Sequence, residues 1–91
     1  MSWKPEGYPE VSAYLVMAGA EKTMEFLKVV FGATLLRRYD TPDGEVMHAE
    51  LRIGQSVVMV GEAGGDWKPM PAFLHVYVPA VDETYQAALN A

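Results

Sequence analysis

The apolar and polar positions of this chain follow two different periods, and these periods predict its secondary structure. Residues 11–17 alternate as a strand does, whereas residues 21–31 repeat apolar side chains at helical spacing, with acidic residues in the first turn. Side chains alternate between the faces of a strand and return to one helix face about every 3.6 residues. A strand and a helix ending at Gly32 are therefore predicted. Residues 1–10, with prolines and a glycine, predict an extended arm pinned by its aromatic residues.

Three further strands are predicted after the helix, at residues 34–40, 45–53 and 56–60. A Thr-Pro-Asp-Gly turn separates the first two strands, because Pro and Gly stand where turn geometry favours them, and a Gly-Gln pair forms a tight hairpin between the last two. The middle strand alternates regularly. Its predicted faces are Met47, Ala49, Leu51 and Ile53 on one side and Val46, His48, Glu50 and Arg52 on the other. The first unit is thus βαβββ.

The pattern then begins again and stops before it is complete. After an irregular loop rich in Gly and Pro, a second strand is predicted at residues 72–78 and a second helix at residues 81–91. The two strand–helix units resemble each other in pattern more than in identical residues. We therefore expect a single α+β domain over residues 1–91, made of a first module (11–62), a linker loop (63–71) and the opening βα of a truncated second module (72–91).

Composition excludes several classes of function. With 51% hydrophobic and 21% charged residues, the chain is an ordinary folded protein. A net charge of -5 argues against nucleic acids and anionic membranes as partners. The absence of cysteine excludes disulfides, thiolate metal sites and a cysteine nucleophile. No signal-peptide segment is evident, and no apolar run approaches the roughly 20 residues of a membrane span. We expect a soluble, cytoplasmic protein.

A polar strand face is the first candidate site. His48 and Glu50 are two residues apart on one strand and so share a face. His75 of the second module would join them if it faces this strand across the curved sheet. Two histidines and a carboxylate would suit a metal or substrate site. The same residues would equally form a polar strand face whose carboxylate pairs with Arg37 or Arg38 on the neighbouring strand. We favour a polar lining of a cavity over a metal site.

Aromatic residues form the second candidate. Tyr14, Phe73, His75 and Tyr77 face one side together if the two opening strands present equivalent faces, which would suit a planar or amphipathic ligand. The alternative is that these rings fill the core or a dimer interface. Trp67 stands in a Gly- and Pro-containing loop and either closes over a ligand or folds back onto the sheet edge. No nucleophile triad or nucleotide-binding fingerprint is present.

The order of elements resembles a known family. A βαβββ unit, a Gly/Trp/Pro loop and a second βα that begins Phe-Leu-His-Val-Tyr-Val-Pro at residues 73–79 resemble the glyoxalase/bleomycin resistance protein/extradiol dioxygenase (vicinal oxygen chelate) superfamily. Residues 46–60 look most like its PhnB-like branch. The resemblance implies a curved mixed sheet of βαβββ modules that wraps a ligand cavity, and dimers that share their sheets. It specifies the fold more closely than the function.

The resemblance also implies positions for metal ligands, which this chain does not fill. The metal enzymes of the family carry His on the first strand of each module and Glu on the last, and these positions fall on Ser12, Phe73 and Met59. None of the three is a good ligand for a hard metal ion. If the register is shifted by two residues, these first-strand positions fall on Tyr14 and His75 instead. Of these two residues, only the histidine is an ordinary metal ligand. No cofactor is predicted, and a divalent metal is kept as the alternative.

The leading functional hypothesis is a small-molecule-binding, metal-independent member of the superfamily. The alternatives are a metal-dependent lyase, isomerase or dioxygenase completed by a partner chain or by missing sequence, and an inactive dimeric fragment. A sheet that lacks its later strands leaves an open edge, which natural proteins cover. We therefore expect a homodimer, and strand or module swapping is one way to form it. The predicted cavity lining is Tyr14, Arg37, His48, Glu50, Met59, Trp67, Phe73, His75 and Tyr77, with no catalytic residue or metal ligand assigned.

Overall fold

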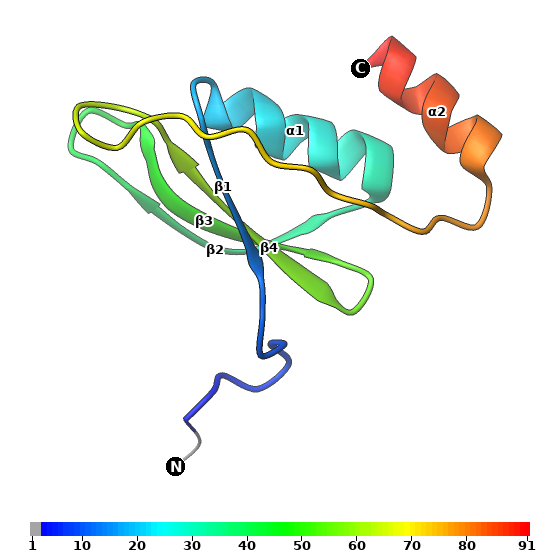
Figure 1. Cartoon of the computed structure of the whole chain (residues 1–91), viewed down its shortest axis with the longest axis horizontal. Helices are drawn as coiled ribbons and strands as arrows, with labels where there is room; N and C mark the ends of the chain where they lie inside the picture. The colour runs from blue at the N-terminus through cyan, green and yellow to red at the C-terminus, as the bar shows by residue number, and fades with distance from the viewer. Residues whose placement is uncertain (1–2) are drawn as a thin grey trace.

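The computed structural model describes residues 3–91 as a four-stranded mixed sheet with a helix packed on one face (Figure 1). The strand order is β1-β4-β3-β2, in which β1 and β4 are parallel and the other neighbours are antiparallel. In chain order the elements are β1 (Ala13–Met17), α1 (Ala20–Phe31), β2 (Thr34–Asp40), β3 (Val46–Ile53), β4 (Ser56–Glu62) and α2 (Val81–Asn90). The predicted α+β class and the βαβββ unit are confirmed.

Both ends of α1 are fixed by specific contacts. The Glu62 carboxylate accepts hydrogen bonds from the backbone N–H groups of Gly19 and Ala20, each at 2.9 Å. A carboxylate stabilises this end because the first N–H groups of a helix lack partners within the helix. The helix ends at Gly32, which has a φ of 68° and donates its N–H to the Lys28 carbonyl at 3.0 Å. Glycine suits this left-handed conformation, so the predicted helix end is confirmed.

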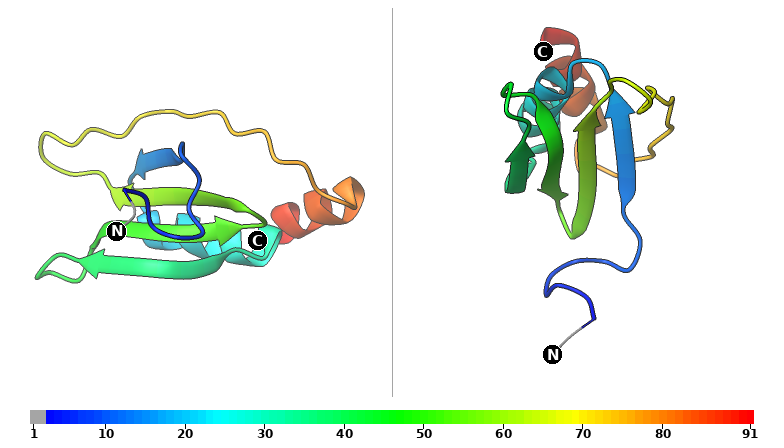
Figure 2. Two further views of the ribbon diagram at one scale, coloured as in Figure 1. Left: turned by 90° about the horizontal axis from the view of Figure 1, so that it is seen from below. Right: turned by 90° about the vertical axis from the view of Figure 1, so that its left-hand side faces the viewer.

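The hydrophobic core lies between α1 and the sheet. The helix buries Ala20, Met24 and Leu27, which belong to one cluster with the fully buried Leu51 of β3 and Val60 of β4. Figure 2 shows both helices on the same side of the sheet. Within residues 3–91 no helix covers the opposite sheet face, and the polar residues of β3 that alternate with the core residues point to that face.

The start of β3 departs from the predicted alternation. Val46 is buried and Met47 is 57% exposed, the reverse of the prediction, which was wrong at these two positions. The cause is a register shift: Tyr39 pairs with His48, whereas the next residue, Asp40, pairs with Val46. One extra residue on β3 therefore bulges out of the ladder, and a bulge changes which side chains face the core.

The strand expected at residues 72–78 does not form. This segment is extended but has no strand neighbour within the described chain (Figure 2), and the loop ahead of it meets β1 through a hydrogen bond from the Met70 N–H to the Val16 carbonyl at 3.0 Å. Alternation indicates which side chains share a face, but a strand also needs a backbone partner. The second helix forms as predicted, ends at Asn90 and packs on α1 without burying a residue.

Neither helix of the described chain is long and apolar enough to cross a membrane. The cytoplasmic location stays a prediction.

Candidate functional site

Four of the predicted cavity residues lie in one row across the sheet. Tyr14 of β1 pairs with Met59 of β4, Met59 pairs with Glu50 of β3, and Glu50 pairs with Arg37 of β2. Directly paired residues of neighbouring strands present their side chains on the same face. The row therefore crosses the face that lies opposite α1.

A chain of hydrogen bonds runs along this face. The Tyr14 hydroxyl lies 3.0 Å from His48 Nδ1, and His48 Nε2 lies 2.7 Å from Glu50 Oε2. The second carboxylate oxygen, Oε1, accepts a hydrogen bond from the Tyr8 hydroxyl at 2.6 Å, and Arg37 Nε lies 3.9 Å from it. Only 7% of Glu50 is exposed, so its charge is held by these partners rather than by water.

The ionisation of Glu50 fixes the direction of these hydrogen bonds. Burial raises the pKa of its carboxyl, but the hydrogen bonds from Tyr8 and His48 and the charge of Arg37 outweigh burial, so that the pKa lies below its ordinary value. An ionised carboxylate only accepts, so His48 Nε2–H donates to it. In the neutral imidazole Nδ1 then accepts from the Tyr14 hydroxyl, which stays protonated because burial and the Glu50 charge raise its pKa.

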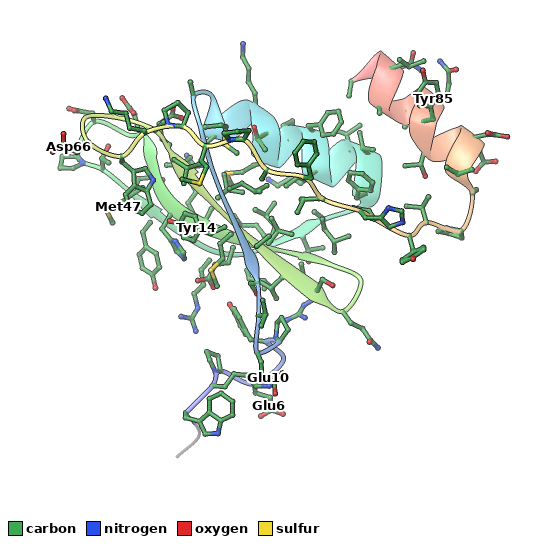
Figure 3. The ribbon with its side chains drawn as sticks, viewed as in Figure 1. Glu6, Glu10, Tyr14, Met47, Asp66 and Tyr85 are labelled. Carbon is green, nitrogen blue, oxygen red and sulfur yellow. The ribbon has the colours of Figure 1, made fainter. Side chains whose placement is uncertain are left out.

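A pocket of about 450 Å³ opens beside this chain of hydrogen bonds. Tyr14, Met47, His48 and Trp67 are among the side chains that line it, and the rings of Tyr14 and Trp67 meet edge to face at 6.1 Å. Figure 3 labels Tyr14 and Met47 here, together with Asp66 in the loop that carries the tryptophan. Aromatic walls with a small number of polar atoms are typical of small-molecule pockets.

The Trp67 loop is a tight turn fixed to the sheet edge. Gly64 and Trp67 exchange two backbone hydrogen bonds, each of 2.9 Å, and Gly65 between them has a φ of 55°, which favours glycine. The Ala63 N–H donates to the Met17 carbonyl at 2.9 Å. Trp67 is still 54% exposed, so the turn holds part of the indole against Tyr14 and leaves the remainder open to solvent.

Gly61 of β4 allows Tyr14 to reach His48. A Cβ atom at Gly61 would lie 3.1 Å from the Tyr14 hydroxyl oxygen and 3.1 Å from the Met47 carbonyl oxygen. Both distances are tighter than ordinary van der Waals contacts, so any larger residue would press on the tyrosine. The sequence offered no signal for this role, because the glycine lies inside a strand where only the fold brings Tyr14 above it.

The remaining predicted residues lie elsewhere. Phe73 and Tyr77 are almost fully exposed, and His75, also exposed, contacts Tyr77 with ring centroids 4.7 Å apart. All three belong to the extended segment 72–78 and make no contact with the hydrogen-bonded residues of β3. The segment lies away from them because it is not paired as a second-module strand.

Three contributors to the site escaped the sequence reasoning. Tyr8 caps Glu50, Tyr39 of β2 places its ring 6.3 Å from that of His48, and Met47 bulges into the pocket wall. The prediction of an arm pinned by aromatic residues pointed to Tyr8 without giving its partner. The other two residues follow from the register shift in β3, which no local pattern signals.

The sequence left open whether Arg37 or Arg38 pairs with Glu50, and the structure decides between them. Arg37 lies in the row with Glu50. Arg38 instead binds Glu21 of α1 through both guanidinium Nη atoms, at 2.7 and 2.9 Å, and Asp40 through Nε at 2.7 Å. Successive residues of β2 therefore serve opposite faces, as strand geometry requires.

The donor atoms on this face do not fit a divalent metal ion. Among the described residues no group of three or more His, Cys, Asp or Glu side chains is placed to hold one. His48 and Glu50 are hydrogen-bonded to each other, and Met59 stands between Glu50 and Tyr14 in the row. Thioether and phenol groups are poor partners for a hard divalent ion.

A βαβββ unit with a curved sheet and one open polar and aromatic face defines a small-molecule-binding fold. The family model described as Glyoxalase/Bleomycin resistance protein/Dioxygenase superfamily matches residues 12–90. The chain therefore belongs to this superfamily, which confirms the predicted family. The PhnB-like branch and the truncation stay predictions.

Curated relatives and a solved structure agree with this assignment. The uncharacterized protein Mb0911c of Mycobacterium bovis is 34% identical, with 91% of this chain and 62% of that protein covered. The uncharacterized protein Rv0887c of Mycobacterium tuberculosis is also 34% identical, with 91% and 55% covered. The chain thus spans little more than half the length of these relatives. TioX from Micromonospora sp. ML1 superposes with a TM-score of 0.63 at 26% identity, covering 90% of this chain and 71% of that chain.

Proposed function

We propose that this protein is a small-molecule-binding, metal-independent member of its superfamily, which holds its ligand on the sheet face opposite α1. The observation that carries the proposal is the pocket of about 450 Å³ in which Trp67 and Tyr14 present their rings beside polar atoms of His48. This volume lies within the range of small-molecule sites. The rings would stack with a planar ligand, and the Tyr14 oxygen would orient it.

The hydrogen bonds of His48 favour binding over catalysis. A general base needs a free lone pair within reach of its substrate. Nε2 of His48 is engaged by Glu50, and Nδ1 is engaged by Tyr14. The Tyr14 hydroxyl is therefore the polar atom that this chain of bonds presents to a ligand.

Fluorescence of Trp67 tests the proposal. The chain has two tryptophans, and Trp3 is 83% exposed, so Trp3→Phe leaves Trp67 as the only tryptophan without disturbing the core. In this background we expect acridine, a planar probe, to quench the fluorescence saturably. Tyr14→Phe should weaken the binding, whereas Tyr77→Phe, at an exposed position, should not. Linear, non-saturating quenching would contradict the proposed site.

Metal content tests the alternative of a metal-dependent lyase, isomerase or dioxygenase. We expect elemental analysis of the protein, purified after incubation with zinc, nickel or iron(II) salts and desalting, to find no stoichiometric divalent ion. A bound ion that is lost in His48→Ala and retained in the His75→Ala control would overturn the metal-independent reading.

We further propose that the protein is a homodimer in which residues 72–78 pair with the β1 edge of a second copy. The Val16 carbonyl faces away from β4, because it accepts from Met70, whereas the Met17 carbonyl accepts from Ala63 on the β4 side. Backbone groups alternate along a strand, so those of Tyr14 also face the free edge.

A second copy of this chain is the partner that fits the free β1 edge, because the described part of each chain carries both a free β1 edge and an unpaired extended segment, residues 72–78. The segment 72–78 is extended, with Phe73 and Tyr77 exposed on one side and Val76 and Val78 half-buried on the other. Exchange between two copies would pair both edges by one self-complementary contact.

Light scattering across a range of concentrations measures the predicted dimer. We expect a dimer that becomes a monomer in Val76→Pro, since proline removes a backbone donor, and that persists in Val76→Ala. A wild-type protein that is monomeric throughout would refute the pairing.

A further inference from the structure

The N-terminal arm, which precedes β1, contacts the candidate site on β3. The Tyr8 hydroxyl binds Glu50 Oε1 at 2.6 Å, and the Gly7 carbonyl accepts a hydrogen bond from Arg52 Nη1 at 2.9 Å. Gly7 has a φ of 83°, and a Cβ there would lie 3.2 Å from the Arg52 guanidinium. The arm is thus shaped to deliver one phenol ring to Glu50.

The atoms around that ring form a recognisable site. Glu50 is almost fully buried, and its Oε2 is already engaged by His48, so Oε1 needs a donor from elsewhere. The guanidinium carbon of Arg37 lies 5.8 Å from the centroid of the Tyr8 ring, a distance typical of a cation–π contact. The site therefore combines a buried acceptor for a hydroxyl with a cation for the face of the ring.

The charges around Glu50 select a neutral donor. The cations of Arg37 and Arg52 offset the charge of the Glu50 carboxylate, so an ammonium group at the Tyr8 position would gain little net attraction there, whereas a neutral hydroxyl does not depend on that attraction. A phenolate would meet the ionised carboxylate of Glu50 directly. An uncharged aromatic hydroxyl is the group that suits all of these neighbours.

We propose that Tyr8 is a built-in occupant of a phenol-binding site formed by Glu50 and Arg37, and that small phenolic compounds bind there in its place. The proposal goes beyond the proposed function, because this site lies on the same sheet face but Tyr8, Arg37 and Glu50 are not among the residues that line the pocket at Trp67. A bound phenol would donate its hydroxyl to Glu50 and lay its ring beneath Arg37, while the arm lifts away.

Competition between the arm and a free phenol gives the proposal a measurable signature. A tethered group competes as if present at millimolar concentration. The probe is p-cresol, which is the tyrosine side chain alone, and toluene is its analogue without the hydroxyl. We expect p-cresol to bind the full-length Tyr8→Ala variant at least about tenfold more tightly than wild type in calorimetric titration. Toluene should show no such gain.

Two further variants make the test specific. Tyr77→Ala removes an exposed tyrosine, and its affinity for p-cresol should equal that of wild type. Glu50→Gln in the Tyr8→Ala background should lose most of the gain, because the amide is a weaker acceptor. Tyr8→Phe, which retains the ring, should bind p-cresol between wild type and Tyr8→Ala, and it serves where the alanine variant does not fold.

The outcomes separate this inference from the proposed function. Equal affinity of wild type and the Tyr8 variants for p-cresol, or toluene bound as tightly as p-cresol, would overturn the phenol site. If acridine still quenches Trp67 saturably in that case, the proposed pocket stands and only the phenol site fails. A Tyr8-dependent gain for p-cresol without acridine quenching would support the phenol site and reject the pocket at Trp67.

Discussion

Replacing Glu50 by glutamine tests the hydrogen-bonded chain directly. The amide has almost the shape of the carboxylate, but it offers one acceptor and one donor in place of two acceptors. Its oxygen would still accept from Tyr8. Its NH₂ group would then face His48 Nε2–H, donor against donor, unless the ring shifts its proton to Nδ1 and donates to the Tyr14 oxygen instead.

The expected loss of stability follows from the bonds that change. A hydrogen bond to a charged group contributes about 1.5–3 kcal/mol, and a neutral one about 0.5–1.5 kcal/mol. Two charged bonds become neutral in Glu50→Gln, while the cost of burying the charge is relieved. We expect the free energy of unfolding to fall by about 1–3 kcal/mol at pH 7.

The stability difference between wild type and Glu50→Gln depends on pH. The pKa of Glu50 is lower in the folded protein than its ordinary value, so its contribution is present above the unfolded value of about 4.3. The contribution is lost as the pH falls through the lower folded pKa. The difference in stability between wild type and Glu50→Gln should therefore shrink as the pH falls below about 4.3.

Urea unfolding between pH 3 and pH 7 measures the difference, and ¹⁵N NMR of the imidazole reports the tautomer of His48. Glu83→Gln, at an exposed position on α2, is the matched control and should change stability by less than about 0.5 kcal/mol. A difference between wild type and Glu50→Gln that stays constant over this pH range would refute the reasoning.

Three other substitutions probe the frame around the site. Leu51→Ala, in a fully buried side chain, should cost about 2–5 kcal/mol of unfolding free energy, and an unchanged urea midpoint would contradict the core assignment. Gly61→Ala should displace Tyr14, seen as altered chemical shifts of its ring and weaker acridine binding, whereas Ser56→Ala, at an exposed position of the same strand, should do neither. Glu62→Gln should cost about 1–2 kcal/mol, since one of two backbone N–H groups loses its acceptor; thermal melting at pH 7 checks this.

Most helices and strands of the fold could be predicted from the sequence, because each depends on the pattern of residues within its own segment. The apolar stripe of α1 and the alternation from His48 to Ile53 reflect which side chains must leave water, and the end of α1 at Gly32 reflects the left-handed conformation that glycine permits. The strand expected at residues 72–78 has the same alternation but no neighbour within the described chain. Pairing is a property of two segments, so one segment cannot specify it.

The residues of the candidate site also differ in whether local spacing or strand pairing brings them together. His48 and Glu50 share a face because they are two residues apart, which any strand would ensure. Tyr14 joins them only because β4 pairs with both β1 and β3, a strand order that no local pattern predicts. Arg37 is one of two candidates on the neighbouring strand, and the β2–β3 register selects it. The contact of Tyr8 with Glu50 depends on the path of the N-terminal arm. Proline and glycine predict that the arm is extended, but they do not predict which residue it contacts.

The hydrogen bonds of the site favour ligand binding over catalysis, because both ring nitrogens of His48 are already engaged. A catalytic His48 would need Tyr14 to swing away, which would leave Nδ1 without its donor and break the edge-to-face contact with Trp67. Tyr8, by contrast, sits on an arm whose removal a ligand hydroxyl can fully compensate at Glu50. A ligand hydroxyl can thus replace the Tyr8 hydrogen bond to Glu50, although lifting the arm also breaks the hydrogen bond from Arg52 to the Gly7 carbonyl, and a ligand that enters there leaves the histidine undisturbed.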